Sequence, residues 1–284
     1  MSDRLAVRKT YKLFIGGAFP RSESGRSYPV HDAKGRFVAN ASQASRKDAR
    51  DAVSAARKAF GGWSGRTAYN RGQILYRVAE MLEGRRDQFA DELRRAGASK
   101  QAAAAEVDAA VDRWVWYAGW ADKLSAVAGA SNPVSGPFFN FSTPEPAGVV
   151  AVVAPDSPLL GLVSVVAPVI VSGNTCVAVA SEPAPLPAIT LAEVLATSDL
   201  PGGVVNLLTG RRVEIAPWLA SHMDVNGVDL TGVAAEHVRG LEEEAAGNLK
   251  RVLRPGKDAW TDDPGTARMT AFLETKTVWH PVGA

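Results

Sequence analysis

Cys176 is the only cysteine in the 284-residue chain, and a cysteine thiolate is a strong nucleophile. A single cysteine excludes an intramolecular disulfide, a Cys-x-x-Cys redox pair and any cysteine-based zinc site. Cys176 lies in the apolar run TCVAVA, residues 175–180, which is typical of a β-strand. Its chemistry therefore depends on whether that strand exposes the thiol or buries it.

The other side chains that could do chemistry are scattered along the sequence. The four histidines have no spacing that would bring two of them to one metal ion, and there is no GxxxxGK[ST] motif for a nucleotide phosphate. The acidic run Glu242–Glu244 is typical of a solvated helix face. The seven tryptophans are expected in the core or at an interface rather than as a platform for bases. Neither a metal centre nor a P-loop is predicted.

Composition limits the classes of partner and the location. The formal net charge is 32 − 30 = +2, which gives no electrostatic argument for binding nucleic acid or an anionic membrane. Prolines and Asp156 interrupt the apolar stretch 148–171, which argues against a membrane-spanning helix. The N-terminal residues include no uninterrupted apolar segment of the kind that a secretory signal needs. We expect a cytoplasmic protein that binds neither nucleic acid nor membrane.

A parallel sheet is predicted to position the chemical groups. The five apolar segments expected as strands are GVVAVVAP (148–155), TCVAVA (175–180), GVVNLLTG (203–210), VNGVDLTG (225–232) and LKRVL (249–253). The intervening segments, near 159–172, 186–198, 211–222 and 233–247, are expected as helices, with Gly173 and Gly247 at C-caps. Strands that alternate with helices predict a right-handed parallel sheet covered on both faces.

The same sheet predicts where a ligand would bind. An open parallel sheet binds its ligands beyond the carboxyl ends of its strands. We therefore expect a cleft near Pro155–Pro158, Ala180–Glu182 and Thr231–Ala235.

Residues before the sheet predict short strands followed by helices. From Tyr11 to Ser42, glycine and proline pairs punctuate short apolar runs. Ser45 and Asp48 have capping-box spacing and predict the start of a first helix. Apolar periodicity then predicts a helix over 70–96 and another over 101–124. The residues expected inward on the 101–124 helix are Val107, Val111, Trp114, Val115 and Ala118.

Ordered blocks of the sequence resemble the aldehyde dehydrogenase family. LFIGGAF and DARDAVSAARKAFGGWS are similar to the family's N-terminal helical region. PEPAGVVAVVAP, SGNTCVAVASEPAPLPA, LPGGVVNLLTG and NLKRV are similar to its cofactor-binding sheet, and ARMTAFLETKTVW to its last strand. The resemblance implies an α/β fold, with a Rossmann-like parallel sheet, an N-terminal helical region and a β oligomerisation arm.

Between Leu253 and Met269 the resemblance is interrupted. The family has a catalytic domain there, whose nucleophilic cysteine attacks the aldehyde before hydride passes to NAD. Cys176 instead matches an inward strand residue, which implies a buried, inert thiol. Asp156 lies in the turn where the family places an oxyanion-stabilising asparagine, and Leu253–Lys257 offers no carboxylate in place of the family's general base. We expect no catalytic residue in this chain.

The resemblance also bears on the cofactor. In the family, a lysine and a glutamate hold the adenosine ribose, and the matching positions here are Val179 and Glu182. The family's pyrophosphate meets a helix N-terminus, where this chain has Gly232 but has His237 in place of a later glycine. Glu182 and Gly232 are therefore the candidate cofactor residues. We expect no bound cofactor, and NAD(P) binding is the alternative. We expect Glu182 to cap the following helix.

Two aromatic or alternating segments lie outside the sheet. By resemblance, residues 132–147 and 263–284 form the oligomerisation arm, and 1–131 with 148–262 the cofactor domain. The candidate partner-binding residues are Phe138, Phe139, Phe141 and Trp279. We expect a non-catalytic subunit that assembles with a full-length aldehyde dehydrogenase, or with itself. The alternative is an NAD(P)-binding oxidoreductase or cofactor sensor.

Overall fold

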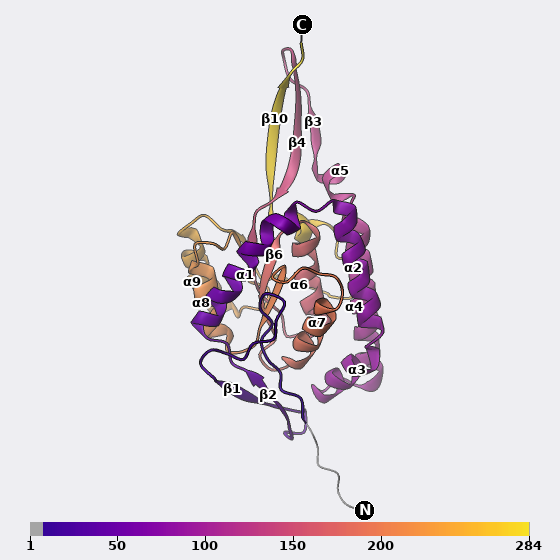
Figure 1. Cartoon of the computed structure of the whole chain (residues 1–284), viewed down its shortest axis with the longest axis vertical. Helices are drawn as coiled ribbons and strands as arrows, with labels where there is room; N and C mark the ends of the chain where they lie inside the picture. Colours follow the sequence, from indigo (N-terminus) through magenta and orange to yellow (C-terminus); the bar gives the residue numbers. More distant parts are fainter. Residues whose placement is uncertain (1–7, 284) are drawn as a thin grey trace, which may run out of the picture.

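The structure is a computed structural model that describes residues 8–283. It has a body of helices packed around a central sheet, and a narrow β arm that stands away from the body (Figure 1). The body begins with an antiparallel hairpin, β1 (Ser27–His31) and β2 (Phe37–Ser42). This hairpin confirms that short strands occupy part of the region before the first helix.

Helix α1 (Arg46–Ser64) begins at the predicted capping box. Ser45 accepts from the backbone N–H of Asp48, and the Asp48 carboxylate accepts from the backbone N–H of Ser45 at 2.7 Å. The side chain of Asp48 is buried, and it also accepts hydrogen bonds from Ser22 Oγ at 2.7 Å and Glu23 N at 3.1 Å. The box therefore fixes the preceding loop as well as the helix.

The single helix predicted over 70–96 is wrong, because two helices occupy that range. They are α2 (Ala68–Glu83) and α3 (Arg86–Arg95). The break at Gly84 and Arg85 is too short to disturb the apolar periodicity, and buried Leu82, Phe89 and Leu93 continue across it. Both α2 and α3 pack against α4 and α7.

The third predicted helix is confirmed as α4 (Lys100–Trp120), which ends before the predicted Leu124, and a separate short helix, α5 (Leu124–Ala128), follows. On α4, Val107 and Trp114 are buried as predicted, whereas Val115 is 40% exposed. The prediction for Val115 is wrong, because the apolar part of the buried face follows a strict alternation of three and four residues. Its members are Ala103, Val107, Ala110, Trp114 and Tyr117.

The five predicted strands form one parallel sheet, in the order β7-β6-β5-β8-β9. Its strands are β5 (Val149–Val153), β6 (Thr175–Val179), β7 (Val205–Leu208), β8 (Gly227–Asp229) and β9 (Arg251–Leu253). The connecting helices are α6 (Leu160–Val171), α7 (Leu186–Ala196), α8 (Arg212–Ser221) and α9 (Ala235–Ala246). The predicted α/β class and the strand–helix alternation are confirmed.

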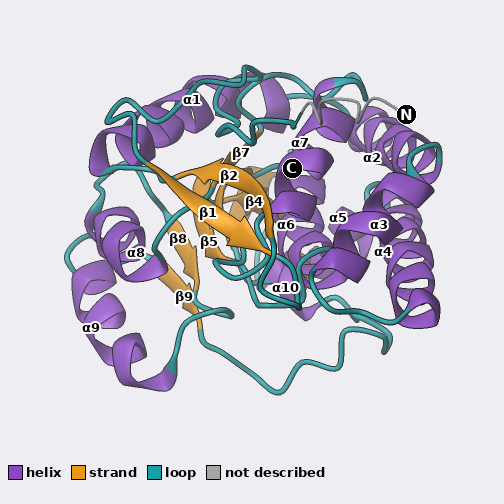
Figure 2. Ribbon diagram, turned by 90° about the horizontal axis from the view of Figure 1, so that it is seen from below, coloured by secondary structure: helices purple, strands orange, loops and turns teal. Residues whose placement is uncertain are grey.

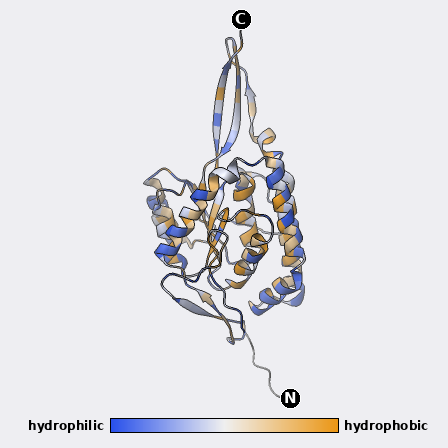
Figure 3. Cartoon of the chain, viewed as in Figure 1, coloured by the Kyte–Doolittle hydropathy of each residue, from blue (hydrophilic) through white to orange (hydrophobic). Residues whose placement is uncertain are grey.

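Helices cover both faces of the sheet and divide the core in two (Figure 2). Val150 and Val152 join a cluster with α2, α3, α4, α6 and α7, whereas Val149 and Val153 join a second cluster with α1, α8 and α9. Successive strand residues point to opposite faces, so a strand buried on both faces is apolar throughout. Figure 3 shows this apolar concentration at the centre of the body.

The two predicted helix ends differ. Gly173 follows α6 with a φ of +94°, the left-handed conformation that favours glycine after a helix. Gly247 ends α9 with a φ of −57°, so the backbone conformation does not require a glycine at this position. The left-handed residue in that loop is Leu249, with a φ of 56°.

The arm is a separate sheet of order β10-β4-β3. Its strands are β3 (Ala130–Asn132), β4 (Phe138–Pro146) and β10 (Leu273–Pro281), and a short helix, α10 (Ala267–Thr270), precedes β10. β4 and β10 pair antiparallel from Pro146–Leu273 to Phe138–Pro281. The predicted pairing of the C-terminal strand with the aromatic segment is confirmed.

Candidate functional site

A pocket of about 500 Å³ lies at the carboxyl edge of the sheet, between α8 and α9. The order of the strands reverses between β5 and β8, and an open parallel sheet binds ligands at such a switch point. Glu182 follows β6 and Gly232 follows β8, and both line this pocket. The structure thus brings the two candidate cofactor residues together. The turn Pro155–Pro158, expected in the same cleft, does not line the pocket.

Glu182 is engaged with the start of α8. Its carboxylate accepts from Arg211 Nη1 at 2.5 Å and from the backbone N–H of Arg212 at 3.3 Å. A negative charge at a helix N-terminus is stabilised by the exposed N–H groups and the helix dipole. The expectation that Glu182 caps the following helix is wrong, because α7 comes next in sequence whereas Glu182 caps α8.

Gly232 has a reason for being glycine that involves no ligand. Its backbone N–H donates to Val153 O at 2.8 Å, which draws the turn onto the end of β5. A Cβ atom at this position would overlap the carbonyl oxygen of Ala154. The close approach of two backbone segments therefore explains Gly232.

Arg212 crosses the switch point. Its guanidinium donates through Nη2 to Asp156 at 2.7 Å and through Nη1 to Gly232 O at 3.3 Å, so it joins the turns that follow β5 and β8. The side chain is only 16% exposed, and among residues 8–283 its buried Nε has no hydrogen-bond partner. Sequence reasoning missed Arg212; its only signal is a pair of arginines directly after the Thr-Gly that follows β7.

The charges around the pocket oppose a pyrophosphate. Glu182, Glu236 and Glu244 line it, and the one guanidinium that lines it, on Arg212, is already paired with Asp156. A pyrophosphate placed at the N-terminus of α9 would meet these carboxylates, and Arg212 would have to leave Asp156 to reach it. The glutamate that would hold a ribose is likewise occupied by Arg211.

Cys176 is the second residue of β6 and has no exposed surface. Burial, and to a smaller extent the nearby charge of Asp229, raise the pKa of its thiol well above the usual range. The prediction of a buried thiol is confirmed, and a buried neutral thiol has neither the charge nor the access that a nucleophile needs.

Two arginines hold the segment that follows the sheet. Arg113 on α4 donates to Ser164 Oγ at 3.1 Å, to Trp260 O at 2.6 Å and to Asp262 O at 2.9 Å. Arg268 donates to Asp229 at 3.0 Å and to Asp258 at 2.9 Å. These contacts tie residues 254–268 to the body. No local pattern in the sequence pointed to either arginine.

The four candidate partner-binding residues lie on the arm in two pairs. Trp279 pairs with Asn140 in the β4–β10 register, so Trp279 and Phe138 share one face, and their rings lie 5.8 Å apart. Phe139 and Phe141 share the opposite face, with rings 5.6 Å apart. A single flat partner surface therefore cannot cover all four.

Metal and membrane features were sought in the part of the chain that the structure describes. Residues 8–283 contain no group of three or more His, Cys, Asp or Glu side chains placed to hold a metal ion. Within the same residues, no helix combines the length and the apolar character that crossing a bilayer requires.

Comparison with known proteins identifies the family to which the sequence is similar. Residues 19–259 match the Aldehyde dehydrogenase family. The chain is 35% identical over 260 residues to retinal dehydrogenase 2 of Homo sapiens, covering 88% of this chain and 49% of that protein. It is 34% identical over 250 residues to cytosolic aldehyde dehydrogenase 1 of Elephantulus edwardii, covering 85% and 49%.

Solved structures agree with these relatives. The NAD⁺ complex of an aldehyde dehydrogenase from Bacillus cereus has a TM-score of 0.81 at 27% identity, covering 86% of this chain and 50% of that one. An NAD-dependent aldehyde dehydrogenase from Sinorhizobium meliloti has a TM-score of 0.82 at 29% identity, covering 86% and 49%. The chain spans about half the length of the relatives it matches. The parallel sheet, the ordered sequence blocks and this match together show that the chain belongs to the aldehyde dehydrogenase family.

Proposed function

We propose that this chain is a non-catalytic subunit that docks through its arm onto a full-length, active aldehyde dehydrogenase, as a structural or regulatory partner. The observation that carries the proposal is the arm itself. β4 and β10 pair over nine residues each and stand clear of the body (Figure 1). Phe138, Phe139 and Trp279 on them are 41%, 50% and 58% exposed.

The edges of the arm favour docking by strand addition. β10 is an edge strand, and β3 covers only three residues of the other side of β4. An edge strand presents unpaired N–H and C=O groups that another strand can extend, and exposed apolar side chains beside it add buried area. Apolar pairs on both faces suit a strand that enters a groove between two surfaces of the partner.

The remaining chemistry supports a non-catalytic role. Cys176, the chain's one thiol, is fully buried in the core on one face of β6. Asp156 is held by Arg212 and offers a negative charge, which would repel an oxyanion. Aldehyde oxidation would therefore belong to the partner, in the cytoplasm where we expect this chain to act.

Co-expression with full-length aldehyde dehydrogenase homologues tests the assembly. We expect a hetero-oligomer that survives sizing and pull-down with at least one homologue. The paired variants Phe138→Ser/Trp279→Ser and Phe139→Ser/Phe141→Ser each remove the apolar side chains of one face, and at least one of them should abolish the complex. Tyr76→Ser is the matched control, because Tyr76 is 52% exposed on α2.

A chain that stays monomeric with every homologue would overturn the proposal, and so would loss of the complex in Tyr76→Ser. A stable homo-oligomer that no homologue enters would assign the arm to self-association instead. Circular dichroism of each variant checks that the body remains folded.

The second candidate function is an NAD(P)-binding oxidoreductase or cofactor sensor, which would use the pocket between α8 and α9. Glu182 and Gly232 both line it. Because its carboxylates oppose a pyrophosphate, we expect no saturable heat in calorimetry at about 1 mM NAD. Saturable binding that weakens in Glu182→Ala would favour this second candidate over the first.

A further inference from the structure

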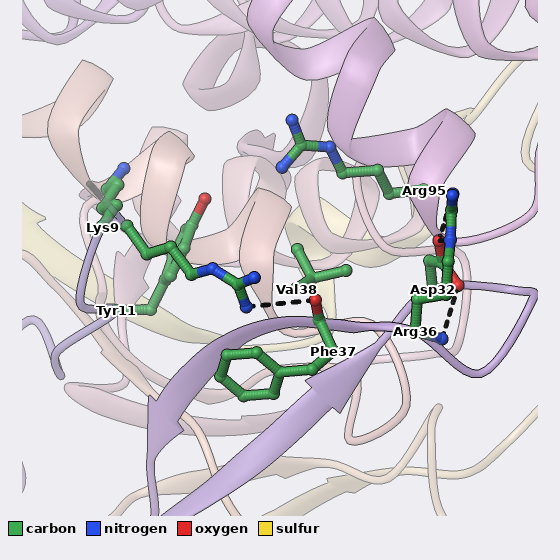
Figure 4. A pocket seen from close by; sticks show the side chains of 8 residues that line it. Lys9, Tyr11, Asp32, Arg36, Phe37, Val38 and Arg95 are labelled. Carbon is green, nitrogen blue, oxygen red and sulfur yellow. Dashed lines mark hydrogen bonds and ion pairs between the residues drawn. The ribbon is translucent and has the colours of Figure 1, made fainter. Parts of the chain in front are cut away.

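A second hollow lies where the N-terminal segment, the β1–β2 turn and the end of α3 meet (Figure 4). Its volume is about 640 Å³. Arg8, Lys9, Arg36 and Arg95 line it against one carboxylate, Asp32, so that the lining carries 4 − 1 = 3 positive charges. A chain with a net charge of +2 thus gathers a local positive excess at one hollow.

Backbone hydrogen bonds bring the three segments together. The N–H of Ala33, in the β1–β2 turn, donates to the carbonyl of Arg95 at 2.9 Å, which places the end of α3 beside the turn. The N–H of Tyr11 donates to Asn40 O at 3.3 Å and places the N-terminal segment along β2. Arg8 Nη1 then donates to Phe37 O at 3.3 Å, and its guanidinium lies 4.8 Å from the Phe37 ring centroid.

The one carboxylate in the lining does not neutralise the hollow. Asp32 accepts from Arg36 Nε at 2.8 Å and from the backbone N–H groups of Lys34 and Arg36, each at 2.9 Å. These hydrogen bonds lower its pKa, so it stays ionised and balances Arg36 alone.

The positive charges of Lys9 and Arg95 are not fully balanced by neighbouring carboxylates. Lys9 pairs with Glu193 at 2.6 Å, but Arg85 contacts the same carboxylate at 2.6 Å, so one negative charge serves two cations. Among residues 8–283, Arg95 makes no ion pair and no side-chain hydrogen bond. Figure 4 shows the Arg95 side chain reaching across the hollow toward the side on which Lys9 lies.

We propose that this hollow binds the phosphate group of a phosphorylated small molecule. Arg8 and Lys9 approach it from the N-terminal segment and Arg95 from the end of α3, and guanidinium groups bind phosphate oxygens through charge-assisted hydrogen bonds. A phosphate offers two charges and several oxygens to cations that converge from different directions, whereas a carboxylate offers one charge and two oxygens. Phe37 and Val38 provide an apolar wall for the rest of the molecule.

Calorimetry on the full chain at low salt tests the site, with inorganic phosphate, phenyl phosphate and acetate as probes. We expect saturable binding of both phosphates, tighter than that of acetate and weakened by added KCl. Arg95→Ala and Arg8→Ala should each weaken phosphate at least about tenfold, because each removes charge-assisted hydrogen bonds.

Arg94→Ala is the matched control, because the neighbouring Arg94 pairs with Asp91 at 3.2 Å and does not line this hollow. We expect it to leave the affinity within about twofold. Tighter binding of phenyl phosphate would support an organic phosphate, and equal affinities would support phosphate itself. The proposal fails if neither phosphate saturates by about 10 mM, or if Arg94→Ala weakens binding as much as Arg95→Ala.

Discussion

Arg268 and Asp229 form a buried ion pair at the carboxyl end of β8, with side chains 14% and 2% exposed. Burial raises the pKa of Asp229, while Arg268 and the two donors of Thr231 oppose that rise. We expect Arg268→Gln to lower the free energy of unfolding at neutral pH by roughly 3–5 kcal/mol, because it leaves a buried carboxylate without its cation. Urea denaturation measures the loss.

The loss should depend on pH. In Arg268→Gln the folded-state pKa of Asp229 rises further above its unfolded value, so the folded state takes up the proton more readily than the unfolded state. The deficit is therefore expected to shrink as the pH falls from neutral toward about 4. Arg251→Gln removes the exposed pair with Glu274 and should cost less than about 1 kcal/mol without this trend. A deficit that grows toward acid pH would contradict the assignment.

At the scale of elements, the capping box of α1 is joined to the loop before it. Asp48 is 4% exposed and accepts from Ser45 N, Ser22 Oγ and Glu23 N. We expect Asp48→Ala to lower the free energy of unfolding by roughly 2–3 kcal/mol, because it leaves buried donors without an acceptor.

Thr67→Ala is the control for this element. Thr67 caps α2 by accepting from Asn70 N at 3.2 Å in an exposed position, so its loss should cost about 1 kcal/mol. Equal losses for the two variants would show that Asp48 acts as an ordinary cap and does not hold the loop.

At the scale of the whole molecule, the two larger core clusters share the strands of one sheet. Val152 and Val153 are adjacent on β5 but belong to different clusters. We expect Val152→Ala and Val153→Ala each to cost roughly 2 kcal/mol. In both variants circular dichroism and the fluorescence of buried Trp63 and Trp114 should change at one midpoint, because unfolding either cluster exposes the shared sheet. Separate midpoints in Val153→Ala would show that the clusters unfold independently.

Local sequence patterns predicted much of the fold. The five strands and the four helices between them could be predicted because short apolar runs, typical of strands buried on both faces, alternate with longer segments of helical length. The burial of Cys176 was predicted from the resemblance to the family, in which the matching position is an inward strand residue. The break at Gly84 and the exposure of Val115 could not be predicted, since neither changes the apolar period over the length of a helix.

The sequence by itself determined the family, the parallel sheet and the edge at which a pocket would form. Only the tertiary structure decided that Arg212 joins the turns after β5 and β8, and that Phe139 lies on the opposite face of the arm from Trp279. It also decided that Arg95 lines a hollow with Arg8. Periodicity depends on neighbours within a few residues, whereas these pairings join residues far apart in sequence and depend on strand register and on how the elements pack.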